Sequence, residues 1–329
     1  VSLGICERVY GSGGKEHAED IRLHIMRNDF MLQSQGASRG MIQIEINMIA
    51  ASFSAHCQDL TEIHRYLLAK YLHRLDASLS PEIVWPVLTA SLPSSPSAQG
   101  IAAAMSAAYD AYRSRWRSTG LPLVVLFVAD VDEKNELDHR KLEAALFKGH
   151  GIISMRRSLA QLAERGSSLE PLEHKMSPSS KGQALVVEGQ EVAVAYFRSG
   201  YWPEQFTPKE ECWAVRERIE VSEAVKCPSA LAQLAGMKKV QQLLCTPSEL
   251  SRFLAKEEAA WLSKTFGQQV DPSNTSAETQ EAVRAAKADP GNWVLKPQLE
   301  GSGDLIFDDD IPRVLTSWTP EQLSGLILM

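Results

Sequence analysis

Leu123-Val-Val-Leu-Phe-Val-Ala129 is apolar at every position. A strand with both faces buried has this pattern, because helices cover both sides of a parallel sheet. Outward from this run, the pattern predicts a helix over 138–148, a strand over 151–155, and strands over 184–187 and 191–198 around the turn Glu188-Gly189-Gln190. Strand, helix and strand thus alternate between residues 121 and 198, and this order predicts a parallel α/β unit.

The remainder of the chain has a more mixed pattern. Its periodicity and capping residues predict a strand over 42–48, helices over 60–75, 101–116, 229–244 and 247–266, a short strand over 293–296, a helix that begins at the N-cap Thr319, and a strand from 325. We therefore expect a protein of the α/β (α+β) class.

Charge and apolar content disfavour several functional classes. The 329 residues include 34 Lys and Arg against 41 Asp and Glu, a formal net charge of −7, without a long basic run. We therefore expect no nucleic-acid or membrane partner. The longest apolar run, 121–129, is shorter than the roughly 20 residues of a membrane-spanning helix. Five scattered cysteines without a C-x-x-C pair predict free thiols and a reducing, cytoplasmic location.

Both ends of the chain lie in apolar segments. The sequence opens at Val1 without an initiator Met, and it closes at Gly325-Leu-Ile-Leu-Met329, which has the pattern of a buried strand. Domains seldom end inside a core element. We therefore expect the sequence to be a fragment of a longer protein, cut at both ends.

Two polar side chains stand on one face of the predicted strand 42–48. Glu45 and Asn47 are two residues apart, and the period of a strand places them side by side. Their oxygens can converge on Mg²⁺, which takes one or two carboxylates and completes its shell with water and phosphate. A half-exposed strand with a polar face is the alternative, and this segment alone favours it.

A second group follows an apolar strand near the end of the chain. Lys296 leaves this strand and precedes Glu300 and the small-residue loop Gly301-Ser302-Gly303. Backbone N–H groups of such a loop can approach phosphate oxygens, while the lysine neutralises phosphate and the glutamate holds a metal. An ordinary glycine turn is the alternative, and the spacing of a Walker A loop is absent.

Arg198 and Lys238 are two further cations that could bind an anionic group of a substrate. Arg198 follows a predicted buried strand, where a guanidinium can bind a carboxylate through two hydrogen bonds. Lys238 lies near Gly236, from which it can reach a phosphate. A surface arginine and a solvated helix face are the respective alternatives.

Taken together and in order, these segments resemble those of the eukaryotic-type glutathione synthetases, a family of ATP-grasp ligases. The resemblance runs from near residue 1 to Met329, and it is carried by Arg27-Asn-Asp-Phe-Met31, residues 43–53, Tyr196-Phe-Arg-Ser-Gly-Tyr201, Lys226-Cys-Pro228, residues 233–242 and residues 294–303. It implies an ATP-grasp fold with an inserted parallel α/β substrate-binding domain. The implied domains are an N-terminal part of the ATP-grasp body at 1–120, the inserted peptide-substrate domain at 121–225, and the nucleotide-binding part with the start of a glycine-rich lid at 226–329.

The resemblance also implies an activity. A ligase of this family joins γ-glutamylcysteine and glycine to give glutathione, ADP and phosphate through an acyl phosphate, which is the second step of glutathione biosynthesis. ATP is the co-substrate, two Mg²⁺ ions serve each active site, and the protein is expected to be a homodimer.

Site residues carry over position by position. The resemblance implies metal binding by Glu45, Asn47 and Glu300; nucleotide binding by Glu45, Lys238, Lys296, Gly301, Ser302 and Gly303; catalytic roles for Arg27 and Lys296; and γ-glutamylcysteine binding by Arg27, Ala50, Ala51, Ser52, Phe53, Glu133, Asn135, His139, Arg198, Ser199, Gly200 and Tyr201. Several positions depart from the family, among them Leu299 in place of a usual Arg and Ser302 in place of a usual Gly. Ala50 stands where Ser is common, and His139 stands where Gln is usual, so we expect a charge there that depends on pH.

Two alternatives to this activity remain open. A related ligase could use another acceptor amine, such as β-alanine, because the family's glycine-binding loop lies beyond Met329. A non-catalytic copy could bind nucleotide or a partner. The retained metal-binding and phosphate-binding residues argue against such a copy, because an inactive site is expected to lose its acidic metal ligands first. The retained residues are Glu45, Asn47, Lys238, Lys296 and Glu300.

Overall fold

The computed structural model describes residues 2–11, 21–33, 40–75, 86, 92–177, 179–298 and 304–329. The chain forms two compact units. Unit 1 comprises Val1–Ile25 and Ile49–Ser229, and unit 2 comprises Met26–Met48 and Ala230–Met329. The three segments predicted as domains stay a prediction.

Unit 1 is built on a mixed sheet. Its strands are β3 (Leu123–Val128), β4 (Ser154–Arg157), β5 (Ser167–Glu173), β6 (Lys181–Val187), β7 (Gln190–Phe197) and β8 (Val225–Cys227). The sheet order is β4-β3-β7-β6-β5, and β8 also pairs with β7. β3 runs parallel to β4 and β7, and β7 runs parallel to β8, whereas β5, β6 and β7 are antiparallel.

The predicted parallel pairing is confirmed for β3, β4 and β7, and the predicted hairpin between β6 and β7 is confirmed too, but β5 and β6 make the sheet mixed. Glu188 and Gly189 both have positive φ, 48° and 75°, which is the geometry of a tight hairpin turn. This turn sends the chain back beside β6 instead of across a helix. The strand β5, which was not predicted, pairs only with β6 and contains Pro171, as edge strands can.

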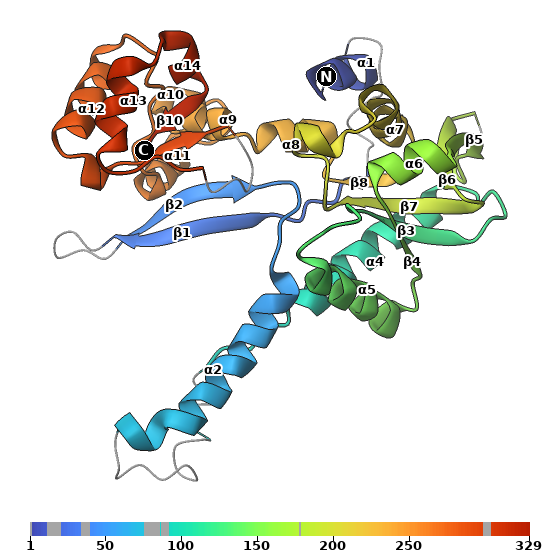
Figure 1. Cartoon of the computed structure of the whole chain (residues 1–329). Coiled ribbons are helices and arrows are strands. Elements are labelled where there is room, and N and C mark those ends of the chain that lie inside the picture. Colours follow the sequence, from blue (N-terminus) through green and yellow to red (C-terminus); the bar gives the residue numbers. More distant parts are fainter. Residues whose placement is uncertain are drawn as a thin grey trace. The chain divides into compact units, whose positions relative to one another are not determined.

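Helices α4 (Ser97–Arg115) and α5 (Glu136–His150) cover one face of this sheet, and α6 (Leu159–Arg165) and α7 (Lys209–Val221) cover the other. Unit 1 also contains α1 (Ser2–Tyr10), which packs against α7, and α2 (Ser54–Leu75), which packs against α4 and α5. Val125 and Phe127 pack with residues of α4 and α5, while Leu126 and Val128 pack with residues of α6 and α7. These two pairs of helices lie on opposite sides of the sheet (Figure 1). β3 is apolar at every position because both of its faces are covered.

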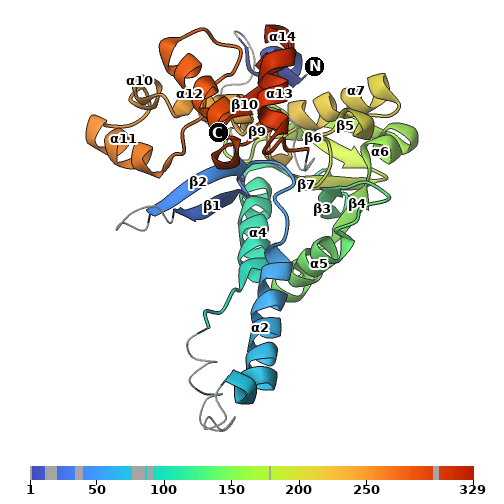
Figure 2. The same ribbon diagram turned by 60° about the vertical axis from the view of Figure 1, so that its left-hand side comes forward.

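Unit 2 holds two pairs of antiparallel strands and seven α-helices among its described residues. The strands are β1 (Arg27–Gln33) with β2 (Gly40–Asn47), and β9 (Leu295–Pro297) with β10 (Leu326–Leu328). The helices are α8 (Ala230–Ala235), α9 (Lys238–Leu244), α10 (Pro247–Leu250), α11 (Lys256–Leu262), α12 (Ala277–Ala288), α13 (Asp310–Ser317) and α14 (Pro320–Ser324). A core of aliphatic side chains joins α12, α13 and α14 to β9 and β10 (Figure 2).

Both long helices predicted for unit 2 are broken in the structure. The first breaks at Gly236, where an added Cβ would lie 2.4 Å from Cγ of Met48, so a close approach of the chain requires glycine. The second is divided into α10 and α11. The Glu258 carboxylate accepts a hydrogen bond of 3.2 Å from the Ala255 N–H group and begins α11 separately.

Several smaller expectations can be compared directly. Gly151 ends α5 in the left-handed conformation, with φ of 67°, so β4 begins at Ser154 rather than at 151. Thr319 is the N-cap of α14, as predicted, and its side chain accepts from the Gln322 N–H group. All five cysteines are free thiols, as predicted. No helix among the described residues is both long enough and apolar enough to cross a membrane.

Candidate functional site

The pair β1–β2 brings two carboxylates and an amide together. Asp29 lies opposite Glu45, and Arg27 lies opposite Asn47. The Asn47 Nδ2 group donates to Asp29 Oδ2 at 3.2 Å and to the Arg27 carbonyl oxygen at 3.3 Å. The amide nitrogen is therefore turned toward β1, and the amide presents its oxygen on the opposite side.

Asp29 is a site residue that the sequence analysis missed. The Arg27 guanidinium donates two hydrogen bonds to its carboxylate, at 2.8 and 2.9 Å. These bonds lower the pKa of Asp29 although burial acts in the other direction, so the group stays ionised. Its position two residues after Arg27, on a strand that could pair with 42–48, was the available signal.

Two lysines face these carboxylates. Lys238 begins α9, and its Nζ lies 3.6 Å from Glu45 Oε2. Lys296 lies in β9 and is 8% exposed. Burial lowers the pKa of Lys296 and the charge of Lys238 lowers it further, while Glu45 and Asp29 raise it. The four charged groups thus form one electrostatic cluster, which we call the phosphate cluster.

The donor set of the phosphate cluster fits Mg²⁺ and phosphate. Carboxylate and amide oxygens are the ligands that Mg²⁺ takes in proteins, and ammonium groups neutralise phosphate charge. Glu45 and Asn47 are the residues that would hold the ion, with Asp29 beside them. The predicted roles of Glu300, Gly301, Ser302 and Gly303 stay predictions, because these residues lie outside the described part of the chain.

A second cluster surrounds Arg198, which directly follows β7 and is 2% exposed. Its Nη1 donates to the Ala51 carbonyl at 2.5 Å and to the Tyr196 hydroxyl at 3.0 Å, and its Nη2 donates to Ser52 Oγ at 2.6 Å. Its Nε donates to His139 Nε2 at 2.8 Å. In this conformation the guanidinium binds protein acceptors, so its predicted binding of a substrate carboxylate stays a prediction.

Asp138, also missed by the sequence analysis, completes this cluster. The carboxylate is fully buried, and its oxygens accept from the N–H groups of Phe53 at 3.1 Å and Ala55 at 2.8 Å. Asp138 Oδ2 lies 3.6 Å from Arg198 Nη2. Because Ala50 and Phe53 both have positive φ, 50° and 76°, the carboxylate and the guanidinium together hold a strained turn before α2.

His139 is neutral and holds one tautomer. An arginine N–H can only donate, so Nε2 of His139 must accept and the proton must sit on Nδ1. Burial, followed by the charge of Arg198, lowers the pKa of His139 to about 3. The charge at this position therefore does not change near neutral pH, which corrects the expectation from the sequence.

The buried His139 predicts an acid-sensitive contribution to stability. Between its folded pKa near 3 and its unfolded pKa near 6.5, the unfolded state binds a proton that the folded state does not. Stability from this group is therefore present above pH 6.5 and falls by about 1.4 kcal/mol per pH unit below it. Urea unfolding at pH 7.5 and 5.0 should show a smaller loss in His139→Gln than in wild type, by about 2 kcal/mol.

His64 offers the control for this measurement, because it is exposed on α2. His64→Gln should keep the wild-type pH dependence. An equal pH dependence in wild type and His139→Gln would contradict a neutral buried His139.

The remaining predicted substrate residues also lie in unit 1, apart from Arg27, which belongs to unit 2. The Glu133 carboxylate accepts from the Asn135 N–H group at 2.7 Å, and Asn135 Oδ1 lies 3.0 Å from His56 Nε2. These contacts order the loop that leads into α5.

The loop after β7 is ordered by a residue that the sequence analysis did not select. Gln205 Oε1 accepts from the N–H groups of Gly200 at 2.8 Å, Tyr201 at 2.9 Å and Trp202 at 3.0 Å. Its Nε2 donates to Asp130 Oδ2 at 2.7 Å. Ser199, at the start of this loop, is fully buried.

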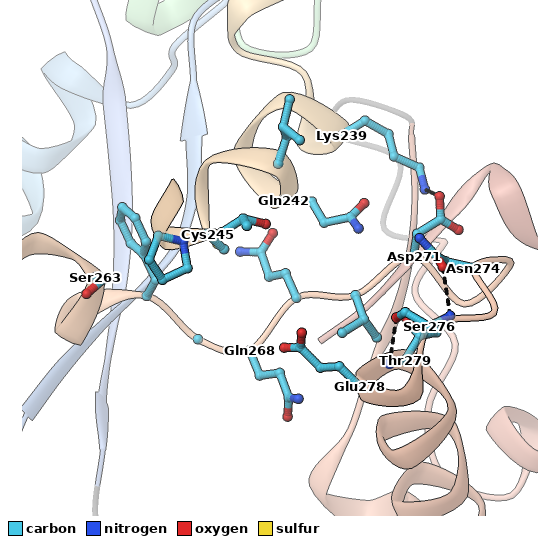
Figure 3. Close-up of a pocket in the computed structure, with 17 residues that line it drawn as sticks. Lys239, Gln242, Cys245, Ser263, Gln268, Asp271, Asn274, Ser276, Glu278 and Thr279 are labelled. Atoms are coloured by element: carbon cyan, nitrogen blue, oxygen red, sulfur yellow. Dashed lines mark hydrogen bonds and ion pairs between the residues drawn. The ribbon is translucent and has the colours of Figure 1, made fainter. Parts of the chain in front are cut away.

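Unit 2 also has a pocket of about 820 Å³ that is separate from these residues. It is lined by α9, residues 263–271 and the start of α12 (Figure 3). The Lys239–Asp271 ion pair of 2.7 Å lies at its wall. Lys239 contributes to this pocket, whereas the adjacent Lys238 contributes to the phosphate cluster, so the two lysines serve different surfaces.

The family of the chain follows from a sequence comparison. The model of the eukaryotic glutathione synthase ATP-binding domain matches residues 5–329. The chain belongs to the eukaryotic glutathione synthase family. The predicted family resemblance is thereby confirmed.

Curated glutathione synthases support this membership. The chain is 35% identical over 309 residues to the chloroplastic glutathione synthetase of Arabidopsis thaliana, covering 93% of this chain and 51% of the relative. It is 35% identical over 315 residues to the Xenopus laevis glutathione synthetase and 33% identical over 317 residues to the human one, and each match covers 60% of the relative. The chain thus spans about half to three fifths of the length of these relatives.

A solved structure confirms the fold. The glutathione synthetase like-effector of Globodera pallida, in its apo form, matches with a TM-score of 0.67 and 17% identity, covering 99% of this chain and 63% of that chain. At this identity the similarity concerns the fold alone. It agrees with the predicted mixed α/β fold of a glutathione synthase.

Proposed function

We propose that the protein is an ATP- and Mg²⁺-dependent ligase that joins γ-glutamylcysteine and glycine to give glutathione, ADP and phosphate. Family membership supports this proposal, and so does one geometric observation. Lys238, Lys296, Asp29 and Glu45 gather in unit 2 with Asn47 beside them, which is the charge pattern that a metal-bound triphosphate requires.

The chemistry assigns a task to each group. The terminal carboxylate of γ-glutamylcysteine takes the γ-phosphoryl group of ATP, and the glycine amine then displaces phosphate as the amide bond forms. Glu45 and Asn47 would hold Mg²⁺, which would supply Lewis-acid stabilisation of phosphate charge. Lys238 and Lys296 neutralise the phosphates, and the buried position of Lys296 strengthens this interaction because little water screens it.

The substrate residues of unit 1 would hold the peptide. We propose that the Ala50–Phe53 turn, Glu133, Asn135 and the loop of Ser199, Gly200 and Tyr201 bind γ-glutamylcysteine. Arg198, which donates to Ala51 and Ser52 of this turn, and His139, which accepts from Arg198, would contribute to the same binding. The catalytic and substrate-binding role predicted for Arg27, which belongs to unit 2, stays a prediction.

Phosphate release tests the proposal directly. The protein is incubated with ATP, Mg²⁺ and γ-glutamylcysteine, with glycine, with β-alanine or without an amine, and the product is identified by mass spectrometry. We expect release that depends on glycine and yields glutathione. Preference for β-alanine would assign another acceptor, and release without any amine dependence would contradict ligase activity.

Two further properties belong to the same proposal. We propose a homodimer, which the family resemblance suggests and which sedimentation equilibrium would test. We also propose a cytoplasmic location, on the grounds of the free thiols, although two relatives are described as chloroplastic. Fluorescence of a tagged full-length protein would distinguish these locations.

A further inference from the structure

Gln241, on α9, bonds to the backbone of β2 at Ile46. The Ile46 N–H group donates to Gln241 Oε1 at 2.8 Å, and Gln241 Nε2 donates to the Ile46 carbonyl at 3.2 Å. One side-chain amide thus satisfies both backbone groups of a single residue, as a neighbouring strand would. The edge of the strand is fixed at this residue.

The same amide also ties down the chain before α9. Gln241 Nε2 donates to the Gly236 carbonyl at 2.8 Å, two residues before Lys238. Gly236 itself packs against Met48, directly after β2, where no side chain could fit. Gln241 therefore joins the segment that carries Lys238 to the strand that carries the predicted metal ligands.

We propose that Gln241 is a positioning residue of the phosphate cluster. Ile46 lies between Glu45 and Asn47, so the amide fixes both through their shared neighbour, and through Gly236 it fixes Lys238. The inference rests on the proposed function. It explains the residue type, because a neutral amide holds the strand without adding charge to a cluster of carboxylates and ammonium groups.

Gln242 is a matched control. It has the same side chain, lies on the same helix and is adjacent in sequence, yet it lines the pocket shown in Figure 3. Gln241→Leu and Gln242→Leu therefore make the same chemical change on two different surfaces.

The first measurement is amide hydrogen exchange at Ile46. In wild type we expect protection of this edge amide, because its hydrogen is bonded to Gln241. Gln241→Leu should speed the exchange of Ile46 by about tenfold or more, and Gln242→Leu should not change it.

The second measurement is the affinity for Mg·ATP by titration calorimetry. Gln241→Leu should weaken binding by about tenfold, and Gln242→Leu should leave it unchanged. Gln241→Glu keeps the size of the side chain and the acceptor for Ile46 N–H but loses the donor to the two carbonyls. It should also weaken binding, which separates hydrogen bonding from packing.

The outcomes are distinguishable. Wild-type affinity in Gln241→Leu, or an equal loss in Gln242→Leu, would overturn the inference. Absence of Mg·ATP binding in wild type would count against the proposed function instead, and in that case the exchange rates of Ile46 still decide whether Gln241 holds the strand.

Discussion

Lys296→Met should lose ligase activity while it keeps or gains stability. The ammonium group of Lys296 is buried in β9 beside Lys238, and both burial and Lys238 lower its pKa. Burial is the largest of these causes. Desolvation of the charged ammonium group therefore costs the fold free energy, and an apolar side chain of similar length would not have this cost. The free energy of unfolding should therefore be unchanged or higher by about 1 kcal/mol.

Activity should fall steeply in the same variant. Charge on the transferring phosphoryl group is stabilised by groups such as Lys296, and removal of one such group reduces kcat by about 10²–10³ fold. Steady-state phosphate release and urea unfolding measure the two effects on one preparation. Lys239→Met is the control, because Lys239 pairs with Asp271 at the pocket of Figure 3 and should retain activity. Wild-type activity in Lys296→Met would show that Lys296 does not stabilise the transferring phosphoryl group.

Asp138→Ala should give the largest loss of stability. The variant leaves the N–H groups of Phe53 and Ala55 without their acceptor and leaves the buried Arg198 without its nearest carboxylate. Breaking a buried charge pair from one side costs about 3–5 kcal/mol, because the remaining charge stays desolvated. The strained Ala50–Phe53 turn should open, and affinity for γ-glutamylcysteine should fall with it.

Urea unfolding and isothermal titration with γ-glutamylcysteine check this prediction. Asp132→Ala changes an exposed carboxylate in the loop that precedes α5, the helix of Asp138, and it should alter the free energy of unfolding by less than about 0.5 kcal/mol. A change below about 1 kcal/mol in Asp138→Ala would show that Asp138 does not support Arg198 or the turn.

Local patterns were sufficient for several features of the molecule. The apolar run 123–129 predicted the buried centre of a sheet, because a strand covered on both faces tolerates no polar side chain. Period-two spacing placed Glu45 and Asn47 on one strand. Lys296 was correctly assigned to a short strand, although it is the central residue of β9 and not its last. Each of these depends on neighbours within a few residues.

Other features were beyond a local pattern. The helix predicted over 229–244 is broken because Met48, far away in sequence, occupies the space beside Gly236. The pairing of β5 with β6, which makes this side of the sheet antiparallel, was not predicted. Asp29 lies opposite Glu45 only because β1 and β2 pair in that register.

The sequence by itself determined the buried central strand and the chemical types at the site: a strand with a carboxylate and an amide, and the two lysines. Only the tertiary structure decided which groups meet. Gln241 bonds Ile46 across 195 residues, and Arg198 bonds Ala51 across 147. A hydrogen bond depends on distances of about 3 Å in space, and periodicity along the chain carries no information about contacts at such separations.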